Sequence, residues 1–237
     1  MRAALRLSHL RSDLVAAVRA LGRAGLWHVG ASASGRDRRT GWCLVTPAGA
    51  EAATLGPRDL SLWSAAGECL EGPARAVPED APVHLRVYAA VAEAGALLMT
   101  RPPLASMLAD EGLGLPPVSR RLRALGGGVR CVPYAPAGSA ALGCLVAEAL
   151  GRRQACLIAA RGAAVRGATP AEAAAALALL ERVAGGYAAA RLSGCAPRRL
   201  RAEEMAPAVR YAGPPLRPSA ARAMPRREDL PWPDPTR

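Results

Sequence analysis

Short apolar runs alternate with longer amphipathic stretches over the first 196 residues, and this alternation limits the possible folds more than any other feature. The short runs have the length of buried strands and lie at 42–46, 95–100, 129–134 and 155–159. The longer stretches carry apolar residues at steps of three and four, which predicts helices at 5–21, 80–93, from 102 onward, at 139–150 and at 169–192. Strands alternating with helices predict a layered α/β protein.

Between these elements the sequence predicts loops and helix ends. The segment 30–41 is rich in Gly, Ser and Arg and is expected to be a loop. Pro57 is suited to the first position of a helix, so one or two helical turns are expected over 57–63. Thr169 and Glu172 have the spacing of a capping box, which predicts the start of the last helix.

Composition changes after residue 196. Nine of the 21 prolines fall in residues 197–237, which also hold many arginines and no sustained periodicity. We therefore expect a folded domain over 1–196 and a Pro/Arg-rich, disordered tail over 197–237. The run Leu230–Pro233 could bind a partner, although Pro-rich sequences of this kind more often act as linkers.

The formal net charge is +12, and all of the basic side chains are arginines. The absence of lysine excludes a Schiff-base aldolase, a pyridoxal-phosphate anchor and a P-loop, since each needs that amine. Lysine, asparagine and phenylalanine are all missing, as in chains from GC-rich genomes, and this codon bias accounts for much of the arginine content. Aromatic residues are only 3% of the chain and the arginines are scattered, so we expect no nucleic-acid partner.

The cysteines and apolar segments favour a reducing compartment. Six cysteines lie far apart, with no CxxC pair and no nearby histidine at ligand spacing, so they carry no zinc signature. The first residues have charges every few positions and no continuous apolar core, and no run has the length expected of a membrane span. A cytoplasmic protein without a membrane span is the expectation.

Five segments, in order, resemble the class II aldolase/adducin family. They are TPAG from Thr46, PVHLRVY from Pro82, GALL from Gly95, VPYAPAGS from Val132 and ACLIAARGAAVRGATPAEA from Ala155. The resemblance covers about residues 5–195. It implies a three-layer α/β/α sandwich around a central mixed sheet, commonly assembled as a homotetramer with clefts between subunits.

The resemblance also locates the metal ligands of the family's enzymes. Those enzymes hold zinc or a similar ion on three histidines, which polarises the substrate carbonyl and hydroxyl. In this chain the corresponding positions are Met99, Arg101 and Arg161. A guanidinium group cannot lose its proton to bind a metal, and two of them would repel it. We therefore expect no metal cofactor.

Other functional positions of the family are only partly retained. The acid/base glutamate corresponds to Asp80, which keeps a carboxylate and makes it the candidate acid/base group. Two phosphate-binding serines correspond to Pro78 and Glu79, while Thr46 and Gly49 keep the identity of the phosphate loop and are candidate ligand-binding residues. His84 matches a family histidine that packs within its helix, and a structural role is expected for it. His9 and His28 have no ligand partners at suitable spacing.

Two hypotheses follow. In the first, the chain is a diverged, metal-free family member, inactive as an aldolase, that serves assembly or binds a small anion through Arg101 and Arg161. Those arginines could equally turn to solvent or pair with acids, and Asp80 could pair with one of them. In the second, the chain remains a lyase, epimerase or decarboxylase acting on a sugar phosphate or hydroxy-carbonyl compound. Both arginines would then stabilise an enolate, and Asp80 would move the proton. A homo-oligomer, such as a tetramer, is the expected assembly.

Overall fold

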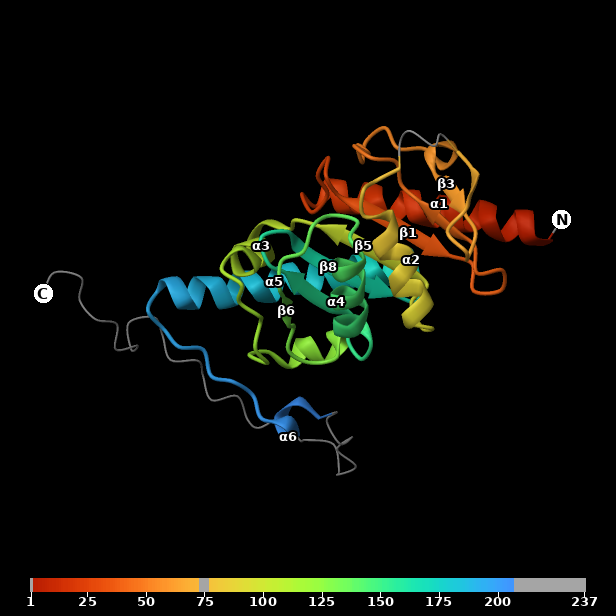
Figure 1. The fold of residues 1–237 in the computed structure, drawn as a ribbon. Helices are drawn as coiled ribbons and strands as arrows, with labels where there is room; N and C mark the ends of the chain where they lie inside the picture. The colour runs from red at the N-terminus through yellow and green to blue at the C-terminus, as the bar shows by residue number, and fades with distance from the viewer. Residues whose placement is uncertain (1, 73–76, 207–237) are drawn as a thin grey trace, which may run out of the picture. The chain divides into compact units, whose positions relative to one another are not determined.

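One eight-stranded sheet forms the centre of the protein, whose computed structural model describes residues 2–72 and 77–206 (Figure 1). The strands are β1 (Ser32–Arg36), β2 (Cys43–Val45), β3 (Ser61–Trp63), β4 (Cys69–Glu71), β5 (Ala96–Thr100), β6 (Cys131–Val132), β7 (Ala155–Ile158) and β8 (Gly162–Gly167). Their order across the sheet is β4-β3-β2-β1-β5-β8-β7-β6. Neighbouring strands are antiparallel except for β6 and β7, which are parallel, so the predicted mixed sheet is confirmed.

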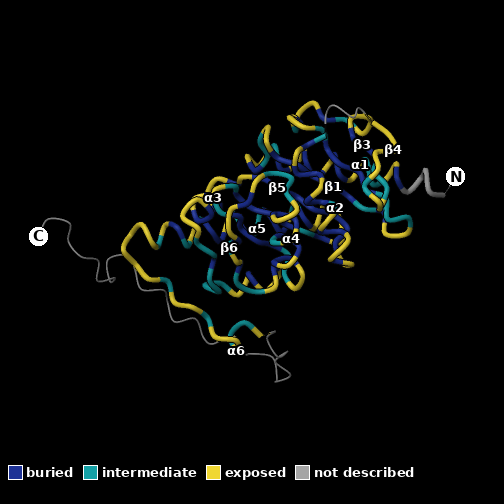
Figure 2. Tube along the Cα trace, in the orientation of Figure 1, coloured by how far each residue is buried: buried dark blue, intermediate teal, exposed yellow. Residues whose placement is uncertain are grey.

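Helices cover both faces of the sheet. One face packs against α1 (Arg2–Arg23), α3 (Pro103–Asp110), α5 (Pro170–Leu192) and the 3-10 helix η3 (Arg120–Leu125). The other face packs against α2 (Ala81–Ala90) and α4 (Ala140–Leu150). Successive residues of a strand point to opposite faces, so Leu97 of β5 joins the α2–α4 core whereas Leu98 joins the α1–α5 core. Figure 2 shows these central strands as buried, and the three-layer α/β/α sandwich is confirmed.

Four strands, β1, β3, β4 and β8, lie where apolar patterning did not predict them. The expected loop 30–41 contains β1, whose sequence SASGR is buried between β2 and β5. Strand β8 has the equally small-residue sequence GAAVRG. Small and polar residues provide little periodic signal, although a central position in the sheet buries them. The expected helical turns over 57–63 were only partly correct, since the 3-10 helix η1 (Pro57–Asp59) gives way to β3.

The long Ala-rich helix α5 belongs to the core. By length and composition it could cross a membrane, with a mean hydropathy of 1.2 over its most apolar window. Its buried residues nevertheless pack within the α1–α5 core, and its N-cap Thr169 accepts a hydrogen bond from the Glu172 amide at the predicted helix start. The Glu172 carboxylate accepts from the Ala168 amide, so only half of the predicted capping box forms. A buried core helix passes the same test of length and composition.

The start of the predicted tail has defined contacts. Residues 197–206 include the short helix α6 (Ala202–Met205), and the folded unit extends to Ala206 rather than ending at 196. The amide of Leu200 donates to the carbonyl of Pro117, and Met205 packs against the core. The remainder of the tail, 207–237, including Leu230–Pro233, lies outside the described residues.

Candidate functional site

A cavity of about 240 Å³ lies where β5 and β7 end and β8 begins. It brings together Asp80, Met99, Arg101 and Arg161, which the sequence analysis singled out across more than 80 residues of chain. Its remaining lining residues are His28, Gly30, Thr100, Ile158, Ala160 and Ala163. The gathering of these candidate residues makes this cavity the candidate functional site.

Asp80 and Arg161 form an ion pair in this cavity. Arg161 Nη2 lies 3.0 Å from Asp80 Oδ1 and 2.9 Å from Oδ2. Asp80 is the N-cap residue of α2, yet its carboxylate makes no capping hydrogen bond and faces Arg161 instead. The Asp80 side chain is 11% exposed and that of Arg161 is 22% exposed. Within the described residues, Arg161 Nε and Nη1 donate to no protein group, so they remain available to a ligand.

Arg101 is held differently, because its side chain already bridges two elements. Its Nη1 donates to the carbonyl of Ala160 at 2.8 Å, and its Nη2 lies 3.1 Å from both carboxylate oxygens of Asp110. The sequence analysis left open whether the two arginines would pair with acids, and in the structure both do so. Asp110 and Ala160 were not singled out from the sequence. Ala160 lies within the quoted segment from Ala155, but nothing in that segment marks it as a partner of Arg101.

His28 is a site residue that sequence reasoning missed. The hydroxyl of Thr100 donates to the carbonyl of Leu26, which holds this loop against the end of β5. The amide of Arg101 then donates to His28 Nε2 at 2.8 Å. Burial and the positive charge of Arg101 lower the pKa of His28. The lowered pKa disfavours the charged form of the ring at this position. The only available sequence signal was its place two residues before Gly30.

The donor groups of this cavity do not fit the zinc ion used by the family's enzymes. The three positions that the resemblance assigns to metal ligands hold a thioether and two guanidinium groups. His28 Nε2 already accepts a main-chain hydrogen bond, and Asp80 is paired with Arg161. A zinc site needs three or four Cys, His, Asp or Glu ligands. Among the described residues, no group of three or more such side chains could hold a metal ion.

Thr46 and Gly49 do not line this cavity. Thr46 is fully buried, and its hydroxyl accepts a hydrogen bond from the Ala33 amide at 3.0 Å, which links β1 to the end of β2. Gly49 has a positive φ of 69° in the turn that follows. These contacts account for TPAG as a turn sequence. A ligand-binding role for either residue remains a prediction.

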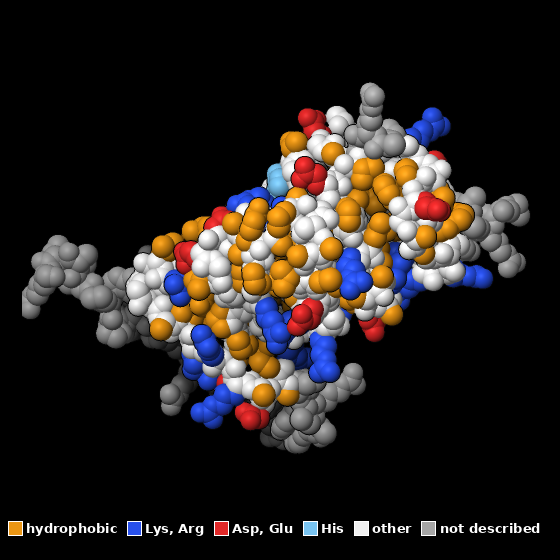
Figure 3. Space-filling view, viewed as in Figure 1, with side chains coloured by type: hydrophobic (Ala, Val, Ile, Leu, Met, Phe, Trp, Pro, Cys, Tyr) orange, Lys and Arg blue, Asp and Glu red, His pale blue; other side chains and the backbone are white. Residues whose placement is uncertain are grey.

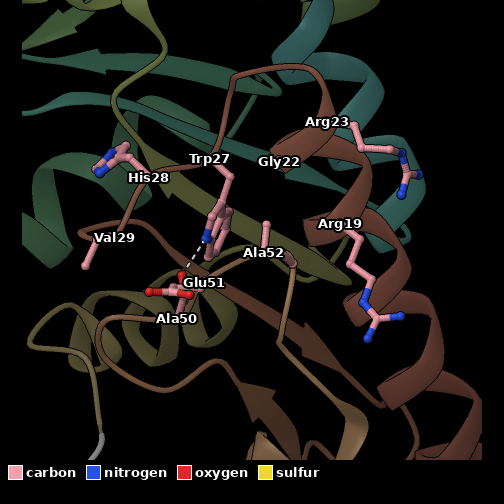
Figure 4. A pocket seen from close by; sticks show the side chains of 10 residues that line it. Arg19, Gly22, Arg23, Trp27, His28, Val29, Ala50, Glu51 and Ala52 are labelled. Carbon is pink, nitrogen blue, oxygen red and sulfur yellow. Dashed lines mark hydrogen bonds between the residues drawn. The ribbon is translucent and has the colours of Figure 1, made fainter.

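A larger cavity of about 700 Å³ lies next to this site and shares His28 with it (Figure 4). Its walls include Arg19 and Arg23 of α1 and the indole of Trp27, whose Nε1 donates to the Ala50 carbonyl. Figure 4 shows the imidazole of His28 pointing away from that indole. The larger cavity includes neither Asp80 nor Arg161. The smaller one therefore remains the stronger candidate.

His84 is buried, as expected of a structural histidine. Its Nε2 lies 2.8 Å from the Ser32 hydroxyl and its Nδ1 lies 2.6 Å from the Ser34 hydroxyl. Burial lowers the pKa of His84 to about 3, so the ring is neutral at physiological pH. Its side chain is fully enclosed between β1 and α2 and has no access to the cavity.

The arginines visible on one face of the protein are dispersed among apolar and acidic side chains (Figure 3). No single basic stripe runs across the described part of this face. A nucleic-acid interface usually gathers its arginines or adds exposed aromatic side chains. The absence of a nucleic-acid partner stays a prediction drawn from composition.

Comparison with known proteins establishes the family. Residues 12–187 match the class II aldolase and adducin N-terminal domain family, and the chain belongs to that family. A 5-deoxy-D-ribulose 1-phosphate aldolase of Bacillus thuringiensis is 32% identical over 126 residues, which cover 53% of this chain and 59% of that protein. The match thus spans less than two thirds of the Bacillus relative.

Two further relatives extend the comparison. A 5-methylthioribulose-1-phosphate/5-deoxyribulose-1-phosphate aldolase of Rhodospirillum rubrum is 31% identical over 161 residues, covering 68% of this chain and 72% of that protein. A solved L-fuculose 1-phosphate aldolase superposes with a TM-score of 0.79 at 25% identity, covering 83% of this chain and 92% of that one. These matches agree with the resemblance seen in the sequence.

Proposed function

We propose that this protein is a metal-free member of its family that does not act as an aldolase and instead binds a small anion in the cavity between Asp80 and Arg161. The Asp80–Arg161 ion pair is the observation that carries the proposal. It puts a fixed positive charge where the resemblance places a metal ligand. An arginine in such a position supplies planar N–H donors for phosphate, sulfate or carboxylate.

The ion pair also determines how an anion would bind. Arg161 Nη2 already faces both oxygens of Asp80, whereas Nε and Nη1 keep their donors. A bidentate anion must share Nη2, so it competes with the Asp80 carboxylate. Asp80 thus acts as an internal competitor, and the cavity of about 240 Å³ favours a compact ligand. Removal of the Asp80 charge should strengthen binding.

Calorimetric titration with inorganic phosphate tests this proposal. We expect binding in the millimolar range, a loss of about tenfold or more in Arg161→Gln and a gain of several-fold in Asp80→Asn. Arg58→Gln, at an exposed arginine of η1, is the matched control and should bind like the unmodified protein. Absence of binding to both the unmodified protein and Asp80→Asn would refute the anion site.

Metal content tests the other half of the proposal. The purified protein is incubated with zinc, freed of excess and analysed by mass spectrometry. We expect near-zero stoichiometry, because the donors around the cavity do not form a set of three ligands. About one tightly held zinc ion per chain would overturn the metal-free proposal.

An active lyase is the second candidate, because Asp80 and Arg161 share one cavity. In such an enzyme Asp80 would take the hydroxyl proton while a carbon–carbon bond breaks, and Arg161 would stabilise the resulting enolate oxygen. The named relatives suggest 5-deoxyribulose 1-phosphate as the substrate to test. Cleavage without added metal that disappears in Asp80→Asn would favour this candidate. No cleavage would favour the anion-binding role.

We also propose a homo-oligomer, such as a tetramer, in the cytoplasm. Family membership supports the assembly, and the six cysteines, all free thiols, fit a reducing compartment. Light scattering coupled to gel filtration measures the mass. A mass equal to the monomer, 24.4 kDa, would rule out a stable oligomer under those conditions.

A further inference from the structure

The turn that carries Arg161 has an unusual backbone. Among residues 2–72 and 77–206, Ala160 is the single residue other than glycine with a positive φ, at 57°. Gly162 follows with a φ of 109°, and a Cβ atom there would lie 2.4 Å from the Thr100 carbonyl oxygen. The turn between β7 and β8 is therefore pressed against the end of β5. A side chain at a positive φ strains the backbone and persists only when its surroundings hold it.

Arg101 and α3 contact the backbone of Ala160 and keep it in this conformation. Its Nη1 donates to the Ala160 carbonyl at 2.8 Å, while the Ala160 amide donates to the carbonyl of Ala109 in α3 at 3.2 Å. Asp110, the next residue of α3, pairs with Arg101 Nη2. The amide of Arg101 is itself tied to His28. Arg101 thus fastens the turn to α3 and to the loop that forms another wall of the cavity.

The pairing of Arg101 with Asp110 has little value as a surface salt bridge. The two side chains are 43% and 48% exposed, and ion pairs this accessible to water contribute little to stability. The geometry of the pair matters more. A planar guanidinium group can bond a carbonyl and a carboxylate at fixed angles, so Arg101 fixes the Ala160 carbonyl relative to Asp110. Arg161 directly follows Ala160, whose carbonyl accepts the hydrogen bond from Arg101. The direction in which the Arg161 side chain leaves the β7–β8 turn therefore depends on the backbone conformation of Ala160 and determines its contact with Asp80.

We propose that Arg101 is a positioning residue: it holds the strained Ala160 turn so that Arg161 faces Asp80, and the anion contacts Arg161. This inference rests on the proposed anion-binding function and deepens it. The sequence resemblance treats Arg101 and Arg161 as equivalent cations at two former ligand positions. The structure separates them, because Arg101 uses both terminal nitrogens on protein groups, whereas among the described residues Arg161 uses only Nη2 in this way.

The variant Asp110→Asn distinguishes a positioning role of Arg101 from a direct attraction between Arg101 and the anion. If Arg101 attracted the anion directly, removal of the nearby Asp110 charge would strengthen phosphate binding. If Arg101 acts through the turn, loss of its anchor weakens phosphate binding, and we expect about a threefold loss by calorimetry. Tighter binding of phosphate by Asp110→Asn would overturn the inference. Arg58→Gln again serves as the control at an exposed arginine.

A rescue experiment adds a second test. We expect Arg101→Gln to weaken phosphate binding by about tenfold, and the added change Ala160→Gly to recover part of it, because glycine adopts a positive φ without support. A direct charge contact would not be recovered by a change that adds no charge. Failure of Ala160→Gly to recover any binding would therefore contradict the positioning role.

A ligand-free measurement separates this inference from the anion-binding proposal. Exchange of the Arg161 guanidinium protons, followed by NMR, reports its pairing with Asp80 without any phosphate. We expect faster exchange in Arg101→Gln and slower exchange once Ala160→Gly is added. If the unmodified protein binds no phosphate but shows this pattern, the anion proposal fails while the positioning role stands. Unchanged exchange in Arg101→Gln would remove the positioning role.

Discussion

The N-cap of α2 and the face of α2 that contacts β1 have polar groups of opposite character. At its start, the Asp80–Arg161 pair borders a cavity, and Arg161 keeps donors that no described protein group uses. Further along, His84 and Tyr88 face β1 and share hydrogen bonds with buried serine hydroxyls. The buried groups are satisfied by the protein, whereas the Asp80–Arg161 pair remains open to a ligand. The comparison indicates that His84, although part of a family-like segment, stabilises the fold, whereas Arg161 is the residue suited to bind a ligand.

Arg36 of β1, which is half-buried, lies beside this region. Its guanidinium lies 5.0 Å from the centre of the Tyr88 ring, and its terminal nitrogens donate to the carbonyls of Tyr88, Ala92 and Ala94. These carbonyls lie at or just after the C-terminal end of α2, where helical partners are missing. A positive charge at this end also complements the helix dipole. Arg36 therefore joins the end of α2 to the central sheet.

The largest expected effect tests this buried region. Arg36→Met should lower the free energy of unfolding by about 3 kcal/mol, because several carbonyls lose a charged donor. Denaturant unfolding measures the change, with Arg58→Met as the control at an exposed arginine. The control should change stability by less than about 0.5 kcal/mol. Equal changes in the free energy of unfolding for Arg36→Met and Arg58→Met would show that Arg36 contributes no more to stability than an exposed arginine.

The next effect is a dependence of stability on pH. The pKa of His84 is about 3 in the folded protein and ordinarily 6.5, because burial disfavours the charged ring. The unfolded chain therefore takes up a proton first as the pH falls. The stability from the neutral ring is fully present above pH 6.5 and is lost as the pH falls from 6.5 to about 3. Between pH 7 and pH 4.5 the loss is about 2.5 kcal/mol.

The matched variant for this prediction is His84→Gln, which keeps hydrogen-bonding atoms near the Ser32 and Ser34 hydroxyls but does not titrate. Unfolding free energies measured from pH 7 to pH 4.5 should fall less steeply in this variant than in the unmodified protein. His84→Gln is expected to be less stable at pH 7, and the comparison rests on the slope alone. Identical slopes would show that His84 is not the group responsible.

The smallest expected effect concerns the open region. Ala160→Gly should raise the free energy of unfolding by about 0.5–1 kcal/mol, since glycine removes the cost of a side chain at positive φ. Ala164→Gly in the adjacent strand β8 is the control and should lower it by about 1 kcal/mol. A loss of stability in Ala160→Gly would mean that this turn is not strained. Backbone strain would then not distinguish the region around Arg161 from the buried region.

Much of the fold followed from apolar patterning, because strands such as β5 and β7 are short apolar runs and α5 begins at a recognisable cap. β1 and β8 could not be predicted in this way. Their small or polar residues are buried by neighbouring strands, and the serines of β1 are satisfied by His84, which lies about fifty residues later. A local sequence pattern cannot predict a hydrogen-bond partner that lies so far away in the sequence.

The sequence by itself determined the family and the layered α/β architecture, because these depend on the order and identity of residues. Only the tertiary structure decided which acid each arginine meets and which of its terminal nitrogens contact described protein groups. Asp80 and Arg161 are brought together by α2 and the β7–β8 turn, whereas Arg101 is turned toward Asp110 and Ala160. These pairings join segments that are far apart in the chain, so residue types alone do not specify them.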